Sequence, residues 1–211
     1  FFYQYAAGIV VLTLTYMGLT AYRDLRDNYA FEILSEIGYS GDAAIFTQTE
    51  IPIAITVLIV MAMLMLIREN KKALIVNHYI IAFGFLLIGS STLLFQQNII
   101  NGFWWMVLVG MGSYLGYVPF NCILFDRFIA TFRTMANAGF LIYIADSFGY
   151  LSSVGVLIYK NLGQSEISWF QFFLNFSYFV CFAGLILTFI SYLYFRQKRM
   201  PVKISSPIQQ T

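Results

Sequence analysis

Charged residues are scarce in this chain: 12 lysines and arginines and 10 aspartates and glutamates make up only 10% of its 211 residues. The hydrophobic fraction is 60%, and the mean hydropathy is +0.75. A water-soluble domain of this length has no core large enough to bury so much apolar surface. The composition therefore excludes a soluble globular protein and predicts an integral membrane protein.

Histidine and cysteine are also rare, with one histidine and two cysteines. Metal sites and disulfide frameworks need clusters of these residues at characteristic spacings, so we expect no metal and no disulfide, and Cys122 and Cys181 read as core thiols. A phosphate-binding glycine loop and a nucleophile elbow are missing as well. The basic C-terminal stretch carries too few charges for nucleic acid. We therefore expect no enzyme activity, no catalytic residues, no cofactor and no nucleic-acid partner.

Long apolar runs are abundant instead. A helix needs about 20 apolar residues to cross about 30 Å of hydrocarbon. Transmembrane strands are shorter and alternate in polarity, whereas residues 51–67 are apolar almost throughout. We predict an all-α, polytopic membrane domain over residues 1–200 and a disordered tail over residues 201–211. The six expected spans cover residues 3–22, 48–67, 77–96, 103–125, 138–159 and 169–195.

The lysines and arginines are distributed unequally between the two sides of the membrane. Six spans place both termini on one side, and cytoplasmic loops carry an excess of basic residues. We therefore expect both termini in the cytoplasm. The chain starts with Phe1 and without an initiating methionine, so we read it as a piece of a longer protein. Nine of the twelve basic residues fall on the side of the termini: Arg68, Lys71, Lys72, Arg127, Arg133, Arg196, Lys198, Arg199 and Lys203.

One short segment concentrates charge. Four charges stand in six residues, directly after 22 uncharged ones, in the sequence Arg23-Asp24-Leu25-Arg26-Asp27-Asn28. Apolar residues at helical spacing continue to Ile37, so the first helix is expected to extend past residue 22. If the following turn centres near residue 39, an antiparallel partner helix brings Glu50 about one turn from Arg26. That register puts the segment inside the outer leaflet, whereas the first apolar run alone puts it at the outer interface.

The charged segment has two interpretations. Insertion scales assign about 2.5–3.5 kcal/mol to a charge in the apolar phase, so such groups usually have a function. The segment is then a binding station for a charged or polar solute, with Asp24, Asp27 or Glu50 exchanging a proton. The alternative is a structural ion network that fixes the first helix against the second.

The fourth and fifth spans supply the other polar candidates. Gly112 and Gly116 form a GxxxG spacing that lets helix backbones approach, and Pro119 invites a kink. Asp146 is the only acidic residue well inside the fifth span, and it needs a hydrogen-bond partner. The antiparallel register of the fourth and fifth spans places Tyr117 and Asn121 at the same depth as Asp146. Asp146 is either protonated and hydrogen-bonded, or a proton or solute site.

Two stretches carry a resemblance: residues 23–28, and the run Tyr117-Val118-Pro119-Phe120-Asn121 through Leu124-Phe125-Asp126-Arg127. They look like an uncharacterised bacterial family, a domain of unknown function related to the major facilitator superfamily. The whole chain resembles the carboxyl-terminal half of a transporter of that superfamily. The resemblance implies that the first and fourth helices line a central cavity. One departure is the loop over residues 68–72, which keeps the charges of the superfamily's loop motif but lacks its two glycines.

The resemblance implies secondary active transport by alternating access. The expected partners are a small polar or charged solute, the lipid bilayer and a missing amino-terminal six-helix half, and the expected location is a bacterial inner membrane. The candidate residues for solute binding or coupling combine the charged segment with the polar groups of the later spans. The alternative is a non-transporting sensor or scaffold in which the charged segment is a clamp. The candidates are Arg23, Asp24, Arg26, Asp27, Asn28, Glu50, Tyr117, Asn121 and Asp146.

Overall fold

The computed structural model describes residues 2–39, 44–133 and 136–198, and these contain helices and no strand. The predicted tail over residues 201–211 lies outside them. Six helical stretches are long and apolar enough to cross a membrane, which confirms the predicted all-α membrane class. The elements are α1 (Phe2–Asn28), α2 (Ala30–Glu36), α3 (Ala44–Met65), α4 (Asn70–Gln96), α5 (Gly102–Pro119), the π-helix η1 (Phe120–Leu124), α6 (Phe125–Phe132), α7 (Ala138–Ile158), the π-helix η2 (Tyr159–Gly163) and α8 (Trp169–Gln197).

The first helix extends past residue 22 as expected but breaks earlier than expected, and the fourth span is longer than predicted. The helix α1 continues beyond residue 22 through the charged segment, then breaks at Tyr29, and α2 ends before Gly38, whose φ of +92° suits a residue without a Cβ atom. After Pro119, which lacks a backbone donor, the chain forms η1 and then α6, so the fourth span extends over Gly102–Phe132. The charged segment is therefore part of a helix rather than of a loop.

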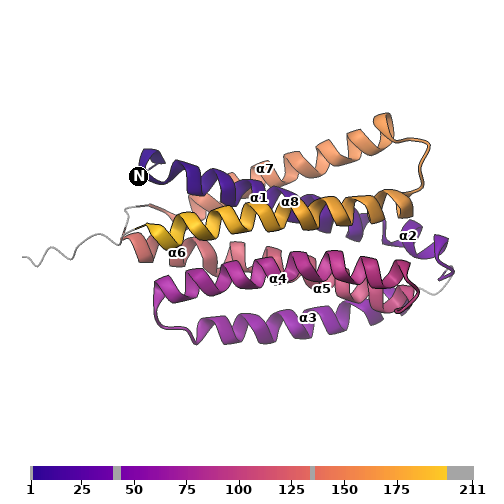
Figure 1. Cartoon of the computed structure of the whole chain (residues 1–211), viewed down its shortest axis with the longest axis horizontal. Coiled ribbons are helices and arrows are strands. Elements are labelled where there is room, and N and C mark those ends of the chain that lie inside the picture. Colours follow the sequence, from indigo (N-terminus) through magenta and orange to yellow (C-terminus); the bar gives the residue numbers. More distant parts are fainter. Residues whose placement is uncertain (1, 40–43, 134–135, 199–211) are drawn as a thin grey trace, which may run out of the picture.

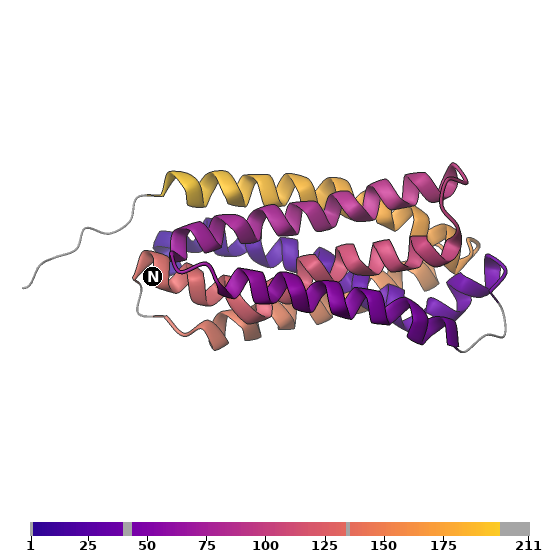
Figure 2. The ribbon, with the colours of Figure 1, turned by 90° about the horizontal axis from the view of Figure 1, so that it is seen from below.

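The six spans run along the long axis of the bundle, with α7 and α3 at opposite edges (Figure 1). The start of α1 and the end of α8 lie at the same end (Figure 2), where Lys198 Nζ donates to the Gln4 carbonyl at 2.9 Å. In α3 and α7, 28% and 22% of the residues in the most apolar window are buried, against 61% in α1 and in the fourth span. The centre of the bundle is therefore formed by α1 and α5.

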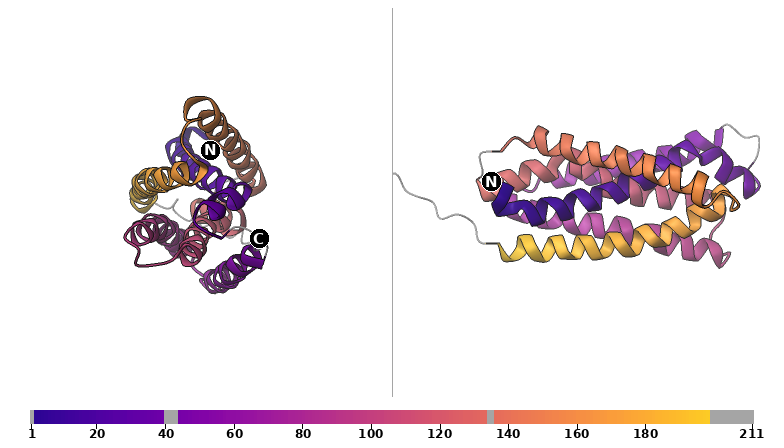
Figure 3. Two further views of the ribbon diagram at one scale, coloured as in Figure 1. Left: turned by 90° about the vertical axis from the view of Figure 1, so that its right-hand side faces the viewer. Right: turned by 90° about the horizontal axis from the view of Figure 1, so that it is seen from above.

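The packing of the first three spans mirrors that of the last three. The first span, α1, packs on α7 and α8, and the fourth, α5, packs on α3 and α4. Helices α1 and α5 also contact each other, as do α4 and α8. Each packed group of three helices therefore combines one helix from one set with two helices from the other set (Figure 3).

Close approach of backbones holds the centre together. A Cβ atom on Gly84 would lie 2.4 Å from the Gly112 carbonyl oxygen, so α4 and α5 touch through their backbones. A Cβ atom on Gly116 would lie 2.7 Å from a Leu19 methyl of α1. The GxxxG spacing thus does what its small residues predict. The prediction of core thiols holds for Cys181 but is wrong for Cys122, which is exposed because its side of η1 faces outward.

Candidate functional site

The charged segment divides into two groups of contacts, and the first surrounds Arg26. This side chain is only 2% exposed, and it donates to Asp27 Oδ1 at 2.8 Å, to Glu50 Oε1 at 2.7 Å and to the Met106 carbonyl at 3.2 Å. The predicted Arg26–Glu50 pair is confirmed. Tyr114 donates its hydroxyl to Asp27 Oδ2 at 2.7 Å. We call Arg26, Asp27, Glu50 and Tyr114 the Arg26 cluster; it joins α1, α3 and α5.

The shape of α5 makes room for the Arg26 guanidinium. A Cβ atom on Gly110 would lie 2.6 Å from Arg26 Cζ and 2.4 Å from Ile53 Cδ1. The guanidinium is therefore pressed against the α5 backbone and takes the Met106 carbonyl as a further acceptor. Its two carboxylate partners are more accessible than the arginine itself, with side chains 34% exposed for Asp27 and 48% for Glu50.

The second group of contacts begins at Arg23, which meets α5 at a different position from Arg26. Its guanidinium carbon lies 3.9 Å from the centroid of the Tyr117 ring, a cation–π contact with α5. Its Nε and Nη2 donate to Asp24 Oδ1 at 3.1 and 2.5 Å. The other oxygen of Asp24 accepts from the Ser153 hydroxyl of α7 at 2.6 Å. Arg23 and Asp24 therefore connect α1 to α5 and α7.

Asp146 finds its partner on α1. The hydroxyl of Tyr16, a fully buried residue, donates to the Asp146 carboxylate and accepts from Asn121 Nδ2 at 3.0 Å. The Tyr16 ring stacks on Tyr117 with centroids 5.1 Å apart and planes 23° apart. Tyr117 and Asn121 do come near Asp146, as predicted, but Tyr16 mediates the approach. We call Tyr16, Arg23, Asp24, Tyr117, Asn121, Asp146 and Ser153 the Tyr16 network.

The two groups of contacts follow one another along α1. Tyr16 and Asp27 are 11 residues apart in sequence, which is about 16 Å along a helix. Both lie within the span Gln4–Asn28. Polar side chains therefore continue for about half of a bilayer's apolar thickness through helices that are otherwise apolar.

Asn28 is the predicted site residue that stands apart. It is exposed, and it lines a cavity of about 170 Å³ between α1 and α7 together with Asp24 and Ser153. Its side chain belongs to neither group of contacts among the described residues, because it lies on the side of α1 that faces this cavity. The other eight predicted residues all fall in the Arg26 cluster or the Tyr16 network.

Sequence reasoning missed three contributors: Tyr16, Tyr114 and Ser153. Spacing gives a signal for Tyr16, because it lies seven residues before Arg23 and eleven before Asp27, on one helix face. Tyr114 likewise precedes Tyr117 and Asn121 by three and seven residues. The position of Ser153 gives no such signal, because it depends on which helix α7 packs against. Among the described residues, no group of three or more histidine, cysteine or acidic side chains is placed to hold a metal ion.

The model of a family of unknown function (DUF5690) matches residues 1–198. No curated protein and no solved structure matches the chain significantly.

Proposed function

We propose that this chain, which belongs to the DUF5690 family of unknown function, forms the carboxyl-terminal half of a secondary transporter for a small polar or charged solute. The exchanged packing of two three-helix sets supports this proposal. An odd number of spans in each set means that the second set crosses the membrane in the opposite sense. Inverted repeats of this kind are typical of transporters that work by alternating access.

The observation that carries the proposal is the polar path along α1. Ionisable groups inside a membrane mark solute and proton pathways more often than other roles. Here they come from α1, α3, α5 and α7, and the resemblance implies that the first and fourth helices, α1 and α5, face the amino-terminal half. The solute would bind between the two halves, and the basic residues beside the termini favour cytoplasmic termini in a bacterial inner membrane.

The net charge of the polar path indicates which kind of solute or coupling ion it would bind. Two arginines, Arg23 and Arg26, stand against four carboxylates, those of Asp24, Asp27, Glu50 and Asp146, which leaves two negative charges. Asp146 makes no ion pair among the described residues; its partner is the Tyr16 hydroxyl. Protons or a cationic solute would neutralise the excess, and Asp146 is the candidate for carrying a proton.

Transport is tested by comparing the solutes taken up by cells that express the full-length protein with those taken up by cells that lack it. Asp146→Asn should abolish the difference. It should change the free energy of unfolding by only about 1 kcal/mol, because the asparagine carbonyl oxygen can still accept a hydrogen bond from the Tyr16 hydroxyl. Asp126→Asn is the matched control, since Asp126 is an exposed acid on the same helical span as Asn121. Normal uptake by well-folded Asp146→Asn protein would contradict the proposal.

The second candidate is a non-transporting sensor or scaffold, and the geometry of Arg26 favours it. A buried guanidinium held by two carboxylates and a carbonyl is the arrangement of a structural clamp. This alternative predicts no difference in solute uptake between expressing and non-expressing cells. It also predicts that variants of Arg26 lose folding while variants of Asp146 behave as wild type.

A further inference from the structure

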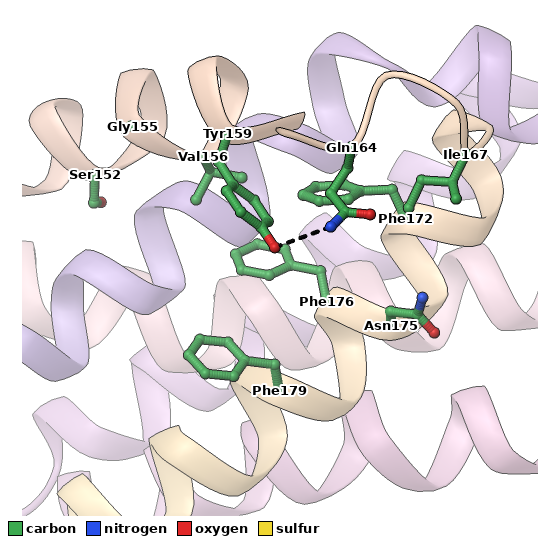
Figure 4. Close-up of a pocket in the computed structure, with 10 residues that line it drawn as sticks. All are labelled: Ser152, Gly155, Val156, Tyr159, Gln164, Ile167, Phe172, Asn175, Phe176 and Phe179. Atoms are coloured by element: carbon green, nitrogen blue, oxygen red, sulfur yellow. Dashed lines mark hydrogen bonds between the residues drawn. The ribbon is translucent and has the colours of Figure 1, made fainter. Parts of the chain in front are cut away.

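A separate cavity of about 590 Å³ opens between α7 and α8, where the two helices diverge toward η2 (Figure 4). Cavities of this size hold small-molecule ligands. None of its lining residues belongs to the Arg26 cluster or the Tyr16 network. They are Ser152, Gly155, Val156, Tyr159, Gln164, Ile167, Phe172, Asn175, Phe176 and Phe179.

The cavity is polar at one end and apolar along its length. At the end near η2, Gln164 Nε2 donates to the Tyr159 hydroxyl at 3.2 Å, and Asn175 lies on the facing helix (Figure 4). Phe176 and Phe179 line the part farther from this end, and Phe179 is 66% exposed on the side of α8. The apolar part is therefore continuous with the surface that the helices present to lipid.

The cavity contains unused space at Gly155. A Cβ atom added there would meet no atom within 4 Å. Side chains on two spanning helices thus leave a channel unfilled in a bundle whose centre is packed to backbone contact. An occupant of this channel needs a flexible apolar portion and a polar head at the η2 end.

Lys160 does not line the cavity itself, but its chain neighbour Tyr159 and its hydrogen-bond partner Gln164 do, so this cation indicates the charge of that head. It follows Tyr159 in η2 and is only 4% exposed. Its Nζ donates to the Gln164 carbonyl at 3.0 Å and lies 4.9 Å from the centroid of the Trp169 ring. An ammonium group has three donors, and Lys160 forms no ion pair among the described residues. Buried charges are otherwise paired, so this cation lacks an anion.

We infer that this cavity binds one anionic phospholipid of the bilayer. Its acyl chain occupies the channel lined by Gly155, Phe176 and Phe179, and its phosphate approaches Lys160 at the polar end. Lysine binds phosphate as a point charge. Tyr159, Gln164 and Asn175 offer a hydroxyl and two amides to the remaining headgroup and ester oxygens.

The test is native mass spectrometry of the full-length protein with palmitoyl-oleoyl phosphatidylglycerol or the matching phosphatidylcholine. Wild type should retain one phosphatidylglycerol. Gly155→Leu should lose it, because leucine fills the channel without a clash. Lys160→Gln should bind phosphatidylglycerol about tenfold more weakly, as expected for one charge-assisted hydrogen bond. Gly18→Leu is the control, since Gly18 is also free of atoms within 4 Å but lines a cavity without a lysine.

Two results would overturn the inference. One is unchanged retention of phosphatidylglycerol by Gly155→Leu. The other is equal retention of both lipids by wild type, which would mean that the site does not select an anionic head. Both measurements use proteins that keep Lys160, so they decide the question even if Lys160→Gln fails to fold. Solute uptake is not part of the readout, so the lipid site and the transport proposal stand or fall separately.

Discussion

Arg23 and Arg26 are three residues apart on α1, yet their surroundings differ in kind. Arg26 is 2% exposed and has two carboxylate partners and a carbonyl, whereas Arg23 is 15% exposed and has one carboxylate and the face of a tyrosine. The contacts of Arg26 come from three helices, and those of Arg23 from α1 and α5. One helical turn therefore carries one arginine with two carboxylate partners and one arginine with a single carboxylate partner.

The proposed function assigns a structural role to Arg26 and a functional role to Arg23. Breaking the contacts of Arg26 would leave Asp27 and Glu50 without their shared cation. Arg23 belongs instead to a path that leads through Tyr117 to Tyr16 and Asp146, and Asp146 has no cationic partner among the described residues. Under the proposed function, the Arg26 cluster is the clamp and the Tyr16 network is the binding station.

The strongest test of this division is to remove each arginine. Removing one partner from a buried ion pair costs about 3–5 kcal/mol, so Arg26→Met should lower the free energy of unfolding by that amount. Arg23→Met should lower it by less, about 1–3 kcal/mol, because the cation–π contact with Tyr117 and the charge-assisted hydrogen bonds to Asp24 are both lost. Unfolding in a denaturing detergent, followed by tryptophan fluorescence, measures both. Equal losses would show that the two arginines share one structural role.

A second test alters the surface on which Arg26 rests. Gly110→Ala places a methyl 2.6 Å from Arg26 Cζ, and overpacking of this kind costs about 1–3 kcal/mol. Gly18→Ala is the control, because its surroundings are open and alanine favours helix. The same denaturation assay applies. Gly110→Ala should cost less in an Arg26→Met background, and strict additivity of the two losses would contradict direct contact.

Much of the fold follows from the sequence for simple reasons. A helix needs a long run of apolar residues to cross the membrane, so all six spans can be recognised as apolar runs in the sequence. The Arg26–Glu50 pair follows from counting residues across one turn. It forms even though α3 packs mainly on α5, because the long arginine side chain reaches between helices.

The partner of Asp146 did not follow from the sequence. Tyr16 is one of 15 tyrosines, and although its spacing places it on the helix face of Arg23 and Asp27, that spacing does not identify Asp146 as the acceptor of its hydroxyl. Its role depends on α7 packing against α1, a contact between segments 130 residues apart. The break at Tyr29 is equally hidden, since apolar periodicity continues through it. Local patterns therefore predict the spans, and helix packing decides which polar groups meet.

The smallest expected effect belongs to Tyr117→Phe, a substitution at the residue that links Arg23 to Tyr16. The Tyr117 ring stacks on Tyr16 and receives the Arg23 guanidinium, and each such contact is worth about 0.5–1.5 kcal/mol. Tyr117→Leu should therefore lower the free energy of unfolding by about that amount per contact, while Tyr117→Phe keeps the ring and should match wild type. If the phenylalanine variant is as unstable as the leucine variant, the hydroxyl rather than the ring holds the network together. Arg23 would then belong with Arg26 as part of a hydrogen-bonded clamp.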